Sequence, residues 1–203
     1  MRFQGKTILV TGAAGGIGSN ITTAFTAEGA RVAVTDLDTK GVEAAAAFDG
    51  NLTDRAFCDA LPQMVKDKLG SLDIVINNAG IITRGPLPDA SDKDIALSLA
   101  VNVEAPLRLC RASIPIMAEQ GGGTIVNTCS CWGLRPGPNH PIYVMTKAAL
   151  ASLTQCLGRD HAHQNIRVNA VCPNEVDTAM LRSGFEARGL DPVSYTHLTL
   201  PTS

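Results

Sequence analysis

The chain has 203 residues, 45% of them hydrophobic, which suits one globular domain with a sizeable core. A net charge of -2 gives no basic surface for nucleic acid or for an anionic membrane. No apolar stretch has the length of a membrane span or the placement of a signal region, and the six cysteines are not spaced as metal pairs or a disulfide frame. We therefore expect a cytoplasmic protein with reduced thiols and no metal.

Predicted strands and helices alternate along the chain. In the first half we expect a strand at 7–11, a helix at 17–28, a strand at 31–36, an alanine-rich helix at 42–47, a very short third strand, a helix at 53–69 and a strand at 72–76. In the second half we expect a long helical region at 91–118, a strand at 123–128, a helix at 142–163 and a strand at 166–171. Several strands are almost wholly apolar, as in parallel sheets covered on both faces. The pattern predicts a single α/β domain with a doubly wound, Rossmann-type parallel sheet.

A glycine-rich stretch joins the first strand to the first helix. Its glycines are Gly12, Gly15, Gly16 and Gly18, and Ile17 precedes the last of them. Glycine lets the backbone turn tightly and approach a diphosphate closely, while the helix N-terminus offers amide donors. A tight turn without a ligand is the alternative. The order of strand, loop and helix is nevertheless the order that dinucleotide binding requires.

An acidic residue ends the second strand. Asp36 lies about 20 residues past the glycine loop, where a carboxylate can accept both ribose hydroxyls of a dinucleotide. The 2′-phosphate of NADP would face this carboxylate, and no arginine or lysine stands at Ala13, Ala14 or Leu37 to neutralise it. We therefore predict NAD as the cofactor. The alternative is that Asp36 is a turn residue that caps the next helix.

The pattern Tyr143-x-x-x-Lys147 places a phenol and an ammonium one helical turn apart, with Ser130 upstream. Lowering a phenol pKa from about 10 to about 7 requires roughly 4 kcal/mol. One cation at about 4 Å in a partly shielded site supplies about that much. The pair could therefore transfer a proton, and Ser130 could hydrogen-bond the oxygen that gains or loses it. An isolated match of this kind is more often a surface lysine beside a packed tyrosine.

Together these motifs resemble the short-chain dehydrogenase/reductase family, in the branch with the short glycine-rich loop. Besides the features above, the segment from Asn77 to Gly80 follows the fourth strand, and Asn102 lies in the long helical region. The motifs occur in the family's order, and the resemblance extends from residue 3 to about 192.

The resemblance implies a role for each residue of the proton-transfer group. Tyr143 would be the general acid/base, and Lys147 would lower its pKa and bind the nicotinamide ribose. Ser130 would orient the substrate oxygen, and Asn102 would connect Lys147 to solvent through a water.

The resemblance also implies further cofactor contacts. They are Asn51 and Leu52 at the adenine, Asn78, Ala79 and Gly80 near the adenine ribose, and Pro173, Val176 and Thr178 at the nicotinamide carboxamide, besides Tyr143 and Lys147. The chain departs from the family pattern at two places. Asn174 follows Pro173 where a glycine is usual, and Asn51 stands where an acid is usual. Asparagine tolerates left-handed backbone angles, so we expect the turn at Asn174 to survive.

The last residues do not follow the family pattern. Residues 193–203 read like the translation of a sequencing adapter, so we expect a catalytic domain at 1–192 that lacks the family's last strand and carries a non-native tail. A divergent natural tail is the alternative. The intact protein is expected to be a dimer or tetramer, since the last strand contributes to the family's oligomer interface, whereas oligomerisation of the truncated chain is doubtful.

The function that these features predict is NAD-dependent hydride transfer between nicotinamide and a secondary alcohol or ketone, such as a polyol, a sugar or a hydroxy acid. Two alternatives remain. One is a 3-oxoacyl thioester reductase, which usually takes NADP and which Asp36 therefore disfavours. The other is a catalytically silent NAD-binding regulator, which the intact set of Ser130, Tyr143 and Lys147 disfavours. Specificity would lie in the loops at 81–88, 132–141 and 174–190, where no motif identifies the substrate.

Overall fold

The structure of the protein is a computed structural model that describes residues 1–186 and 189. The tail expected at 193–203 and the domain end expected at 192 lie outside the described residues. Among the described residues, no helix combines the length and apolar character that crossing a bilayer requires.

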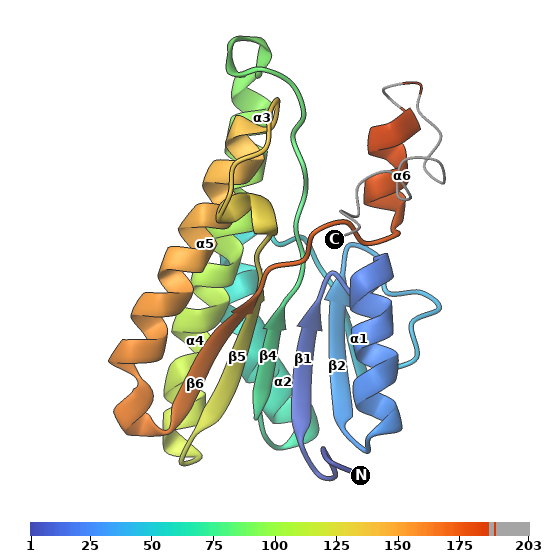
Figure 1. Ribbon diagram of the computed structural model, residues 1–203. Coiled ribbons are helices and arrows are strands. Elements are labelled where there is room, and N and C mark those ends of the chain that lie inside the picture. Colours follow the sequence, from blue (N-terminus) through green and yellow to red (C-terminus); the bar gives the residue numbers. More distant parts are fainter. Residues whose placement is uncertain (187–188, 190–203) are drawn as a thin grey trace, which may run out of the picture.

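Six parallel strands form one sheet in the order β3-β2-β1-β4-β5-β6 (Figure 1). The strands are β1 Thr7–Thr11, β2 Arg31–Asp36, β3 Ala46–Asp49, β4 Ile74–Asn77, β5 Gly123–Thr128 and β6 Ile166–Val171. The chain runs outward from β1 to β3 and then returns to β4 on the other side of β1. The predicted doubly wound α/β sheet is therefore confirmed. In such sheets, ligands bind beyond the carboxyl ends of the strands, where the winding reverses.

Helices cover both faces of the sheet. They are α1 Gly16–Ala27, α2 Arg55–Leu69, α3 Asp92–Leu99, α4 Ala105–Glu119, α5 Pro141–Asp160 and α6 Ala179–Glu186, with single turns η1 Leu87–Asp89, η3 Cys131–Gly133 and η4 Ala162–Gln164 and a π-helical segment η2 Ala100–Glu104. Figure 1 shows α1 on one face, α2, α4 and α5 on the other, and α6 beyond the carboxyl ends of the strands.

Successive residues of β1 contribute to two separate cores. Leu9 packs with residues of α2 and α4, including Leu61 and Leu109. Ile8 and Val10 belong to the second core, which partly buried residues of α1 complete. Alternate residues of a strand point to opposite faces, so a strand buried on both faces must be apolar throughout. This is why the apolar runs identified the central strands from sequence.

The alanine-rich helix predicted at 42–47 is wrong. Residues 37–45 contain no helix, and Ala46 begins β3, which pairs with β2 from Ala33 opposite Ala46 to Asp36 opposite Asp49. The Asp49 carboxylate accepts hydrogen bonds from the Thr39 backbone N–H and hydroxyl at 2.8 and 2.6 Å, which folds the connection back onto the strand. Tertiary pairing outweighs the helix propensity of alanine here. The third strand has four residues, so the prediction that it is very short is confirmed.

The helical region predicted at 91–118 is continuous but not uniform. It begins as predicted, since Ser91 accepts a hydrogen bond from the Asp94 backbone N–H at 3.1 Å. Between α3 and α4 the backbone widens into the π-helical segment η2. Such segments are rare and often lie at functional sites. Asn102 is within this one.

Candidate functional site

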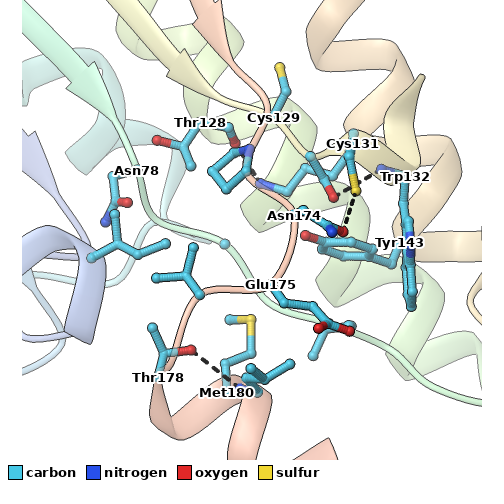
Figure 2. Close-up of a pocket in the computed structure, with 18 of the residues that line it drawn as sticks. Asn78, Thr128, Cys129, Cys131, Trp132, Tyr143, Asn174, Glu175, Thr178 and Met180 are labelled. Carbon is cyan, nitrogen blue, oxygen red and sulfur yellow. Dashed lines mark hydrogen bonds between the residues drawn. The ribbon is translucent and has the colours of Figure 1, made fainter. Parts of the chain in front are cut away.

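A pocket of about 360 Å³ lies at the carboxyl ends of the strands. Its walls are formed by the segments that follow β4, β5 and β6, by the first turns of α5, by the start of α6 and by one side chain of α1 (Figure 2). Nine of the residues predicted for the site line this pocket, namely Ile17, Asn78, Gly80, Ser130, Tyr143, Lys147, Pro173, Val176 and Thr178. The fold thus brings together residues from five separate segments of the chain.

The glycine loop requires glycine at two positions for steric reasons. Gly12 has a φ of +66°, and a Cβ atom there would lie 2.8 Å from Ala79 Cα. A Cβ atom on Gly18 would overlap the Gly12 carbonyl oxygen. Gly15 is the N-cap of α1 and supplies no side-chain acceptor to the first turn of the helix. Gly16 packs against Thr178, since a Cβ atom on Gly16 would lie 3.0 Å from Thr178 Cγ2.

The segment after β4 is held against the glycine loop. The Thr11 hydroxyl accepts hydrogen bonds from the backbone N–H groups of Asn78 and Ala79, both at 3.0 Å. The Asn78 side-chain amide donates to the carbonyl oxygens of Thr11 and Gly12 at 3.0 and 3.2 Å. These bonds place Asn78 and Gly80 at the wall of the pocket beside the loop.

Asp36 does not cap a following helix, since residues 37–45 contain no helix, and its role at the ribose stays a prediction. Its carboxylate accepts hydrogen bonds from the backbone N–H groups of Ala14 at 2.9 Å and Leu37 at 2.8 Å, so it caps its own turn and also fixes the glycine loop. A carboxylate has about four acceptor sites, and two of them remain for a ribose. No ion pair recorded between described residues includes Asp36.

The residues predicted for the adenine do not line the pocket. Asn51 is exposed, and its side-chain oxygen accepts a hydrogen bond from the Thr53 backbone N–H at 2.9 Å. Leu52 packs against the core under α2 and α4. Their role at the adenine stays a prediction.

The three residues of the proton-transfer group share one wall of the pocket. Ser130 follows β5 with extended backbone, and its hydroxyl oxygen accepts from the Trp132 N–H at 3.2 Å and makes a hydrogen bond with the Tyr143 phenol. Gly133 lets the following turn pack closely on α5, because a Cβ atom there would lie 2.8 Å from the Lys147 carbonyl carbon. The predicted juxtaposition of Ser130, Tyr143 and Lys147 is therefore present in the structure.

Lys147 is only 3% exposed. Its ammonium donates a hydrogen bond to the Thr128 carbonyl oxygen at 2.8 Å and lies 5.8 Å from the centre of the Tyr143 ring. Burial lowers the pKa of Lys147 to about 8, because the charged form is costly away from water. The amine is thus placed on the pocket wall and carries most of its charge at neutral pH.

The expected lowering of the Tyr143 pKa by Lys147 is not found. Burial raises the pKa of the phenol above its ordinary value, and the hydrogen bond with Ser130 offsets only part of this rise. Desolvation of the phenol is the largest contribution to its pKa, and the Lys147 ammonium donates its hydrogen bond to the Thr128 carbonyl oxygen. The protein's own groups therefore keep Tyr143 protonated at neutral pH.

Asn102 is 1% exposed and fixes the loop beyond β4. Its side-chain oxygen accepts from the Ile81 N–H and its amide donates to the Ile81 carbonyl, both at 2.8 Å. Its amide also donates to the Thr146 hydroxyl at 3.1 Å. Gly80 lies between this side chain and Lys147, since a Cβ atom there would be 3.4 Å from Asn102 Oδ1 and 3.1 Å from Lys147 Nζ. The predicted link to solvent through a water stays a prediction.

Several residues of the pocket were not predicted from sequence. Thr128 is buried, and its hydroxyl has no hydrogen-bond partner among the described residues. Asn174 does not adopt the left-handed backbone considered for it, and its side-chain oxygen instead accepts from the Cys131 thiol at 3.1 Å (Figure 2). Trp132 and Glu175 also line the pocket. Both lie in the loops at 132–141 and 174–190 that were expected to set specificity, but no motif singled them out.

Residues 6–189 match the family model of the short chain dehydrogenases. The chain therefore belongs to the short-chain dehydrogenase family. It is an NAD(P)-dependent short-chain dehydrogenase/reductase that acts on CH–OH groups, as its motifs predicted.

Several relatives have comparable identity to the chain. An uncharacterized oxidoreductase of Thermotoga maritima is 39% identical over 197 residues, which cover 92% of this chain and 78% of the relative. A sorbitol dehydrogenase of Cereibacter sphaeroides is 37% identical over 186 residues, covering 87% of this chain and 73% of the relative. A 3-oxoacyl-[acyl-carrier-protein] reductase of Thermotoga maritima is 33% identical over 191 residues, covering 89% and 78%.

Solved structures share the fold. The ligand-free aldohexose dehydrogenase of Thermoplasma acidophilum superposes with a TM-score of 0.88 at 29% identity, over 96% of this chain and 76% of that chain. A short chain dehydrogenase of Burkholderia cenocepacia in complex with NADP gives 0.82 at 35% identity, over 89% and 78%. These comparisons support an NAD(P) cofactor without distinguishing NAD from NADP.

Proposed function

We propose that the protein transfers hydride between NAD and a secondary alcohol or ketone, with Tyr143 as the general acid/base. The observation that carries this proposal is that Ser130, Tyr143 and Lys147 line one pocket together with Ile17 of α1 and Thr178, which borders the glycine loop. Polyols, sugars and hydroxy acids are the candidate substrates. The sorbitol dehydrogenase relative supports the first of these classes.

The residues of the pocket suit a dinucleotide. The first turn of α1 has no side-chain cap, so its amides suit a diphosphate. The buried hydroxyl of Thr128 has no partner among the described residues, and a polar ligand in the pocket would satisfy it. Gly12, Gly16, Thr178 and Val176 would hold the dinucleotide between the loop and the segment after β6. When bound, the dinucleotide supplies or accepts the hydride at nicotinamide C4.

The chain's own residues handle the proton. In ketone reduction the Tyr143 hydroxyl gives its proton to the substrate oxygen, and in alcohol oxidation the phenolate takes it. Ser130 hydrogen-bonds the same oxygen and so fixes its position relative to Tyr143. The Lys147 ammonium favours the phenolate electrostatically, and this attraction strengthens when bound ligands exclude water from the pocket.

The preference for NAD rests on Asp36. Its carboxylate lies at the end of β2 beside the glycine loop, where it would accept the ribose hydroxyls and repel a 2′-phosphate. This feature also favours an alcohol dehydrogenase over a 3-oxoacyl thioester reductase. The reductase remains the second candidate, because a relative with that activity in its name is 33% identical.

The test is turnover of a panel of polyols, sugars, hydroxy acids and a 3-oxoacyl thioester with NAD(H) and NADP(H). We expect NAD-dependent turnover of secondary alcohols, reduced by about 10²-fold or more in S130A, since orientation and hydrogen bonding at the reacting oxygen contribute that much. The control is S113A, because Ser113 is buried in α4 away from the pocket. Equal turnover by wild type and S130A would overturn the proposal.

A further inference from the structure

The part of the pocket next to Tyr143 carries two side chains that the proton-transfer mechanism does not use. Trp132 and Glu175 both line it, and Figure 2 shows them on the side of the pocket where Tyr143 lies. Glu175 is the one carboxylate among the described residues that line the pocket. An aromatic ring beside a group that only accepts hydrogen bonds favours a ligand that offers both C–H surface and hydroxyl donors.

The Trp132 ring is held rigidly. The His140 ring packs on it with centroids 4.7 Å apart, and the Tyr143 ring meets it edge-on at 6.4 Å. Gly137 lies so close that a Cβ atom there would be 2.7 Å from Trp132 Cε2. The Trp132 backbone N–H donates to the Ser130 hydroxyl oxygen, which ties the ring position to the catalytic residues. A rigid indole offers a flat apolar surface to C–H groups at little entropic cost.

Glu175 lies between Asn174 and Val176, which both line the pocket. Asn174 is held by the Cys131 thiol at 3.1 Å, and Val176 lines the pocket on the other side. An ionised carboxylate has no donor and about four acceptor sites, so it can accept from a substrate hydroxyl while it keeps other contacts.

The Arg84 guanidinium also lines the pocket, and it makes a contact of its own with α6. The Arg84 guanidinium donates to the Met180 carbonyl oxygen at 2.7 Å and lies against Gly184, so it joins the loop after β4 to α6. Binding of a substrate carboxylate by Arg84 would compete with this attachment. An anionic substrate would also approach the charge of Glu175.

We propose, building on the function proposed above, that Glu175 and Trp132 select neutral polyhydroxylated substrates. Glu175 accepts hydrogen bonds from hydroxyls next to the reacting carbon, and the Trp132 ring covers the C–H face of the same carbon chain. A simple secondary alcohol gains neither a bond to Glu175 nor a long contact with the indole. A hydroxy acid brings a negative charge near Glu175.

The experiment compares sorbitol and xylitol with 2-butanol and 3-hydroxybutyrate, using NAD and the full chain as wild type and E175Q. A hydrogen bond to a charged group is worth roughly 10- to 100-fold in affinity, so E175Q is expected to lower kcat/KM for the polyols by about that factor, mainly through KM. For 2-butanol the change is expected to stay below about threefold, and for 3-hydroxybutyrate kcat/KM is expected to rise.

The matched control is D177N. Asp177 lies two positions further along the same segment, is not among the residues that line the pocket, and forms an exposed ion pair with Arg182 at 2.8 Å. D177N removes one carboxylate charge, as E175Q does, but leaves the proposed contact intact. The ratio of polyol to 2-butanol activity is therefore expected to stay at the wild-type value. The same ratio in E175Q and wild type would overturn the selection by Glu175.

A binding measurement separates this inference from the proposed function. In Y143F loaded with NAD, sorbitol is expected to raise the melting temperature, and E175Q in the same background is expected to abolish that rise. If wild type oxidises no alcohol while this binding pattern holds, the proposed function fails and the selection of polyols stands. If 2-butanol is oxidised but sorbitol neither binds nor reacts, the selection fails and the proposed function stands.

Discussion

The Lys147 ammonium donates a hydrogen bond to the carbonyl oxygen of Thr128, the last residue of β5, at 2.8 Å. This bond joins α5 to the end of the strand that leads to Ser130. It fixes a buried amine on the pocket wall beside the Tyr143 ring, where burial raises the pKa of the phenol. Any lowering of the Tyr143 pKa therefore requires bound ligands.

Buried Lys147 makes the stability of the ligand-free protein depend on pH. Its folded pKa of about 8 is below the unfolded value of 10.5, so between these values the unfolded chain binds more protons and rising pH stabilises the fold. The free energy of unfolding of wild type, relative to K147M, should therefore rise by roughly 3 kcal/mol between pH 8 and 10.5. Urea unfolding of both proteins across this range measures it. A difference that does not change with pH would show that the amine is solvated.

The raised pKa of Tyr143 predicts opposite pH dependences for the two directions of reaction. Alcohol oxidation needs the phenolate, so its kcat/KM should increase with pH through the alkaline range. Ketone reduction needs the protonated phenol and should fall there. Initial rates with NAD and an alcohol, and with NADH and the ketone, give both profiles. Parallel profiles in the two directions would exclude Tyr143 as the titrating group.

Cofactor choice should depend on Asp36. In D36A the ratio of NADPH to NADH dissociation constants should shift by about 10- to 100-fold toward NADPH, because charge-assisted hydrogen bonds to the ribose and repulsion of the 2′-phosphate are both lost. Fluorescence titration measures both constants. The matched control is D38A, whose exposed carboxylate accepts only a local hydrogen bond recorded from the Lys40 N–H. The same shift in D38A would mean that net charge, not position, sets the preference.

Asn102 should matter for stability as much as for turnover. In N102A, the N–H and C=O groups of Ile81 each lose a 2.8 Å partner. Leaving these half-buried backbone groups unsatisfied costs about 1 kcal/mol each, so the free energy of unfolding should fall by about 2 kcal/mol. Chemical denaturation of the ligand-free protein checks this. A loss of activity with unchanged stability would instead favour a role in proton transfer alone.

Sequence patterns predicted the fold well where burial dictates residue type. The strands β1, β2, β5 and β6 were predicted with their observed bounds. For β1 and β2 the reason is that strands covered on both faces must be apolar. The alanine-rich segment before Asp49 was mistaken for a helix, because its structure is decided by pairing with β2, which local composition does not encode.

The site was predictable to the extent that it consists of closely spaced motifs. The spacing from Tyr143 to Lys147 placed both on α5, and the glycine loop fell between β1 and α1 as predicted. The bond from Lys147 to Thr128 depends on how α5 packs against β5, and the π-helical placement of Asn102 depends on the loop after β4. Neither could be predicted from residue order. Only the three-dimensional structure shows that Trp132 and Glu175 line the same pocket.

Proton transfer by Tyr143 is the central step of the proposed reaction, and Y143F tests it most directly. We expect turnover of the best alcohol substrate to fall by about 10²- to 10⁴-fold, the usual contribution of a general acid/base, while the dissociation constant of NADH stays within about threefold of wild type. Turnover and NADH titration on the same preparation give both numbers. Y143F turnover equal to wild type would contradict the account.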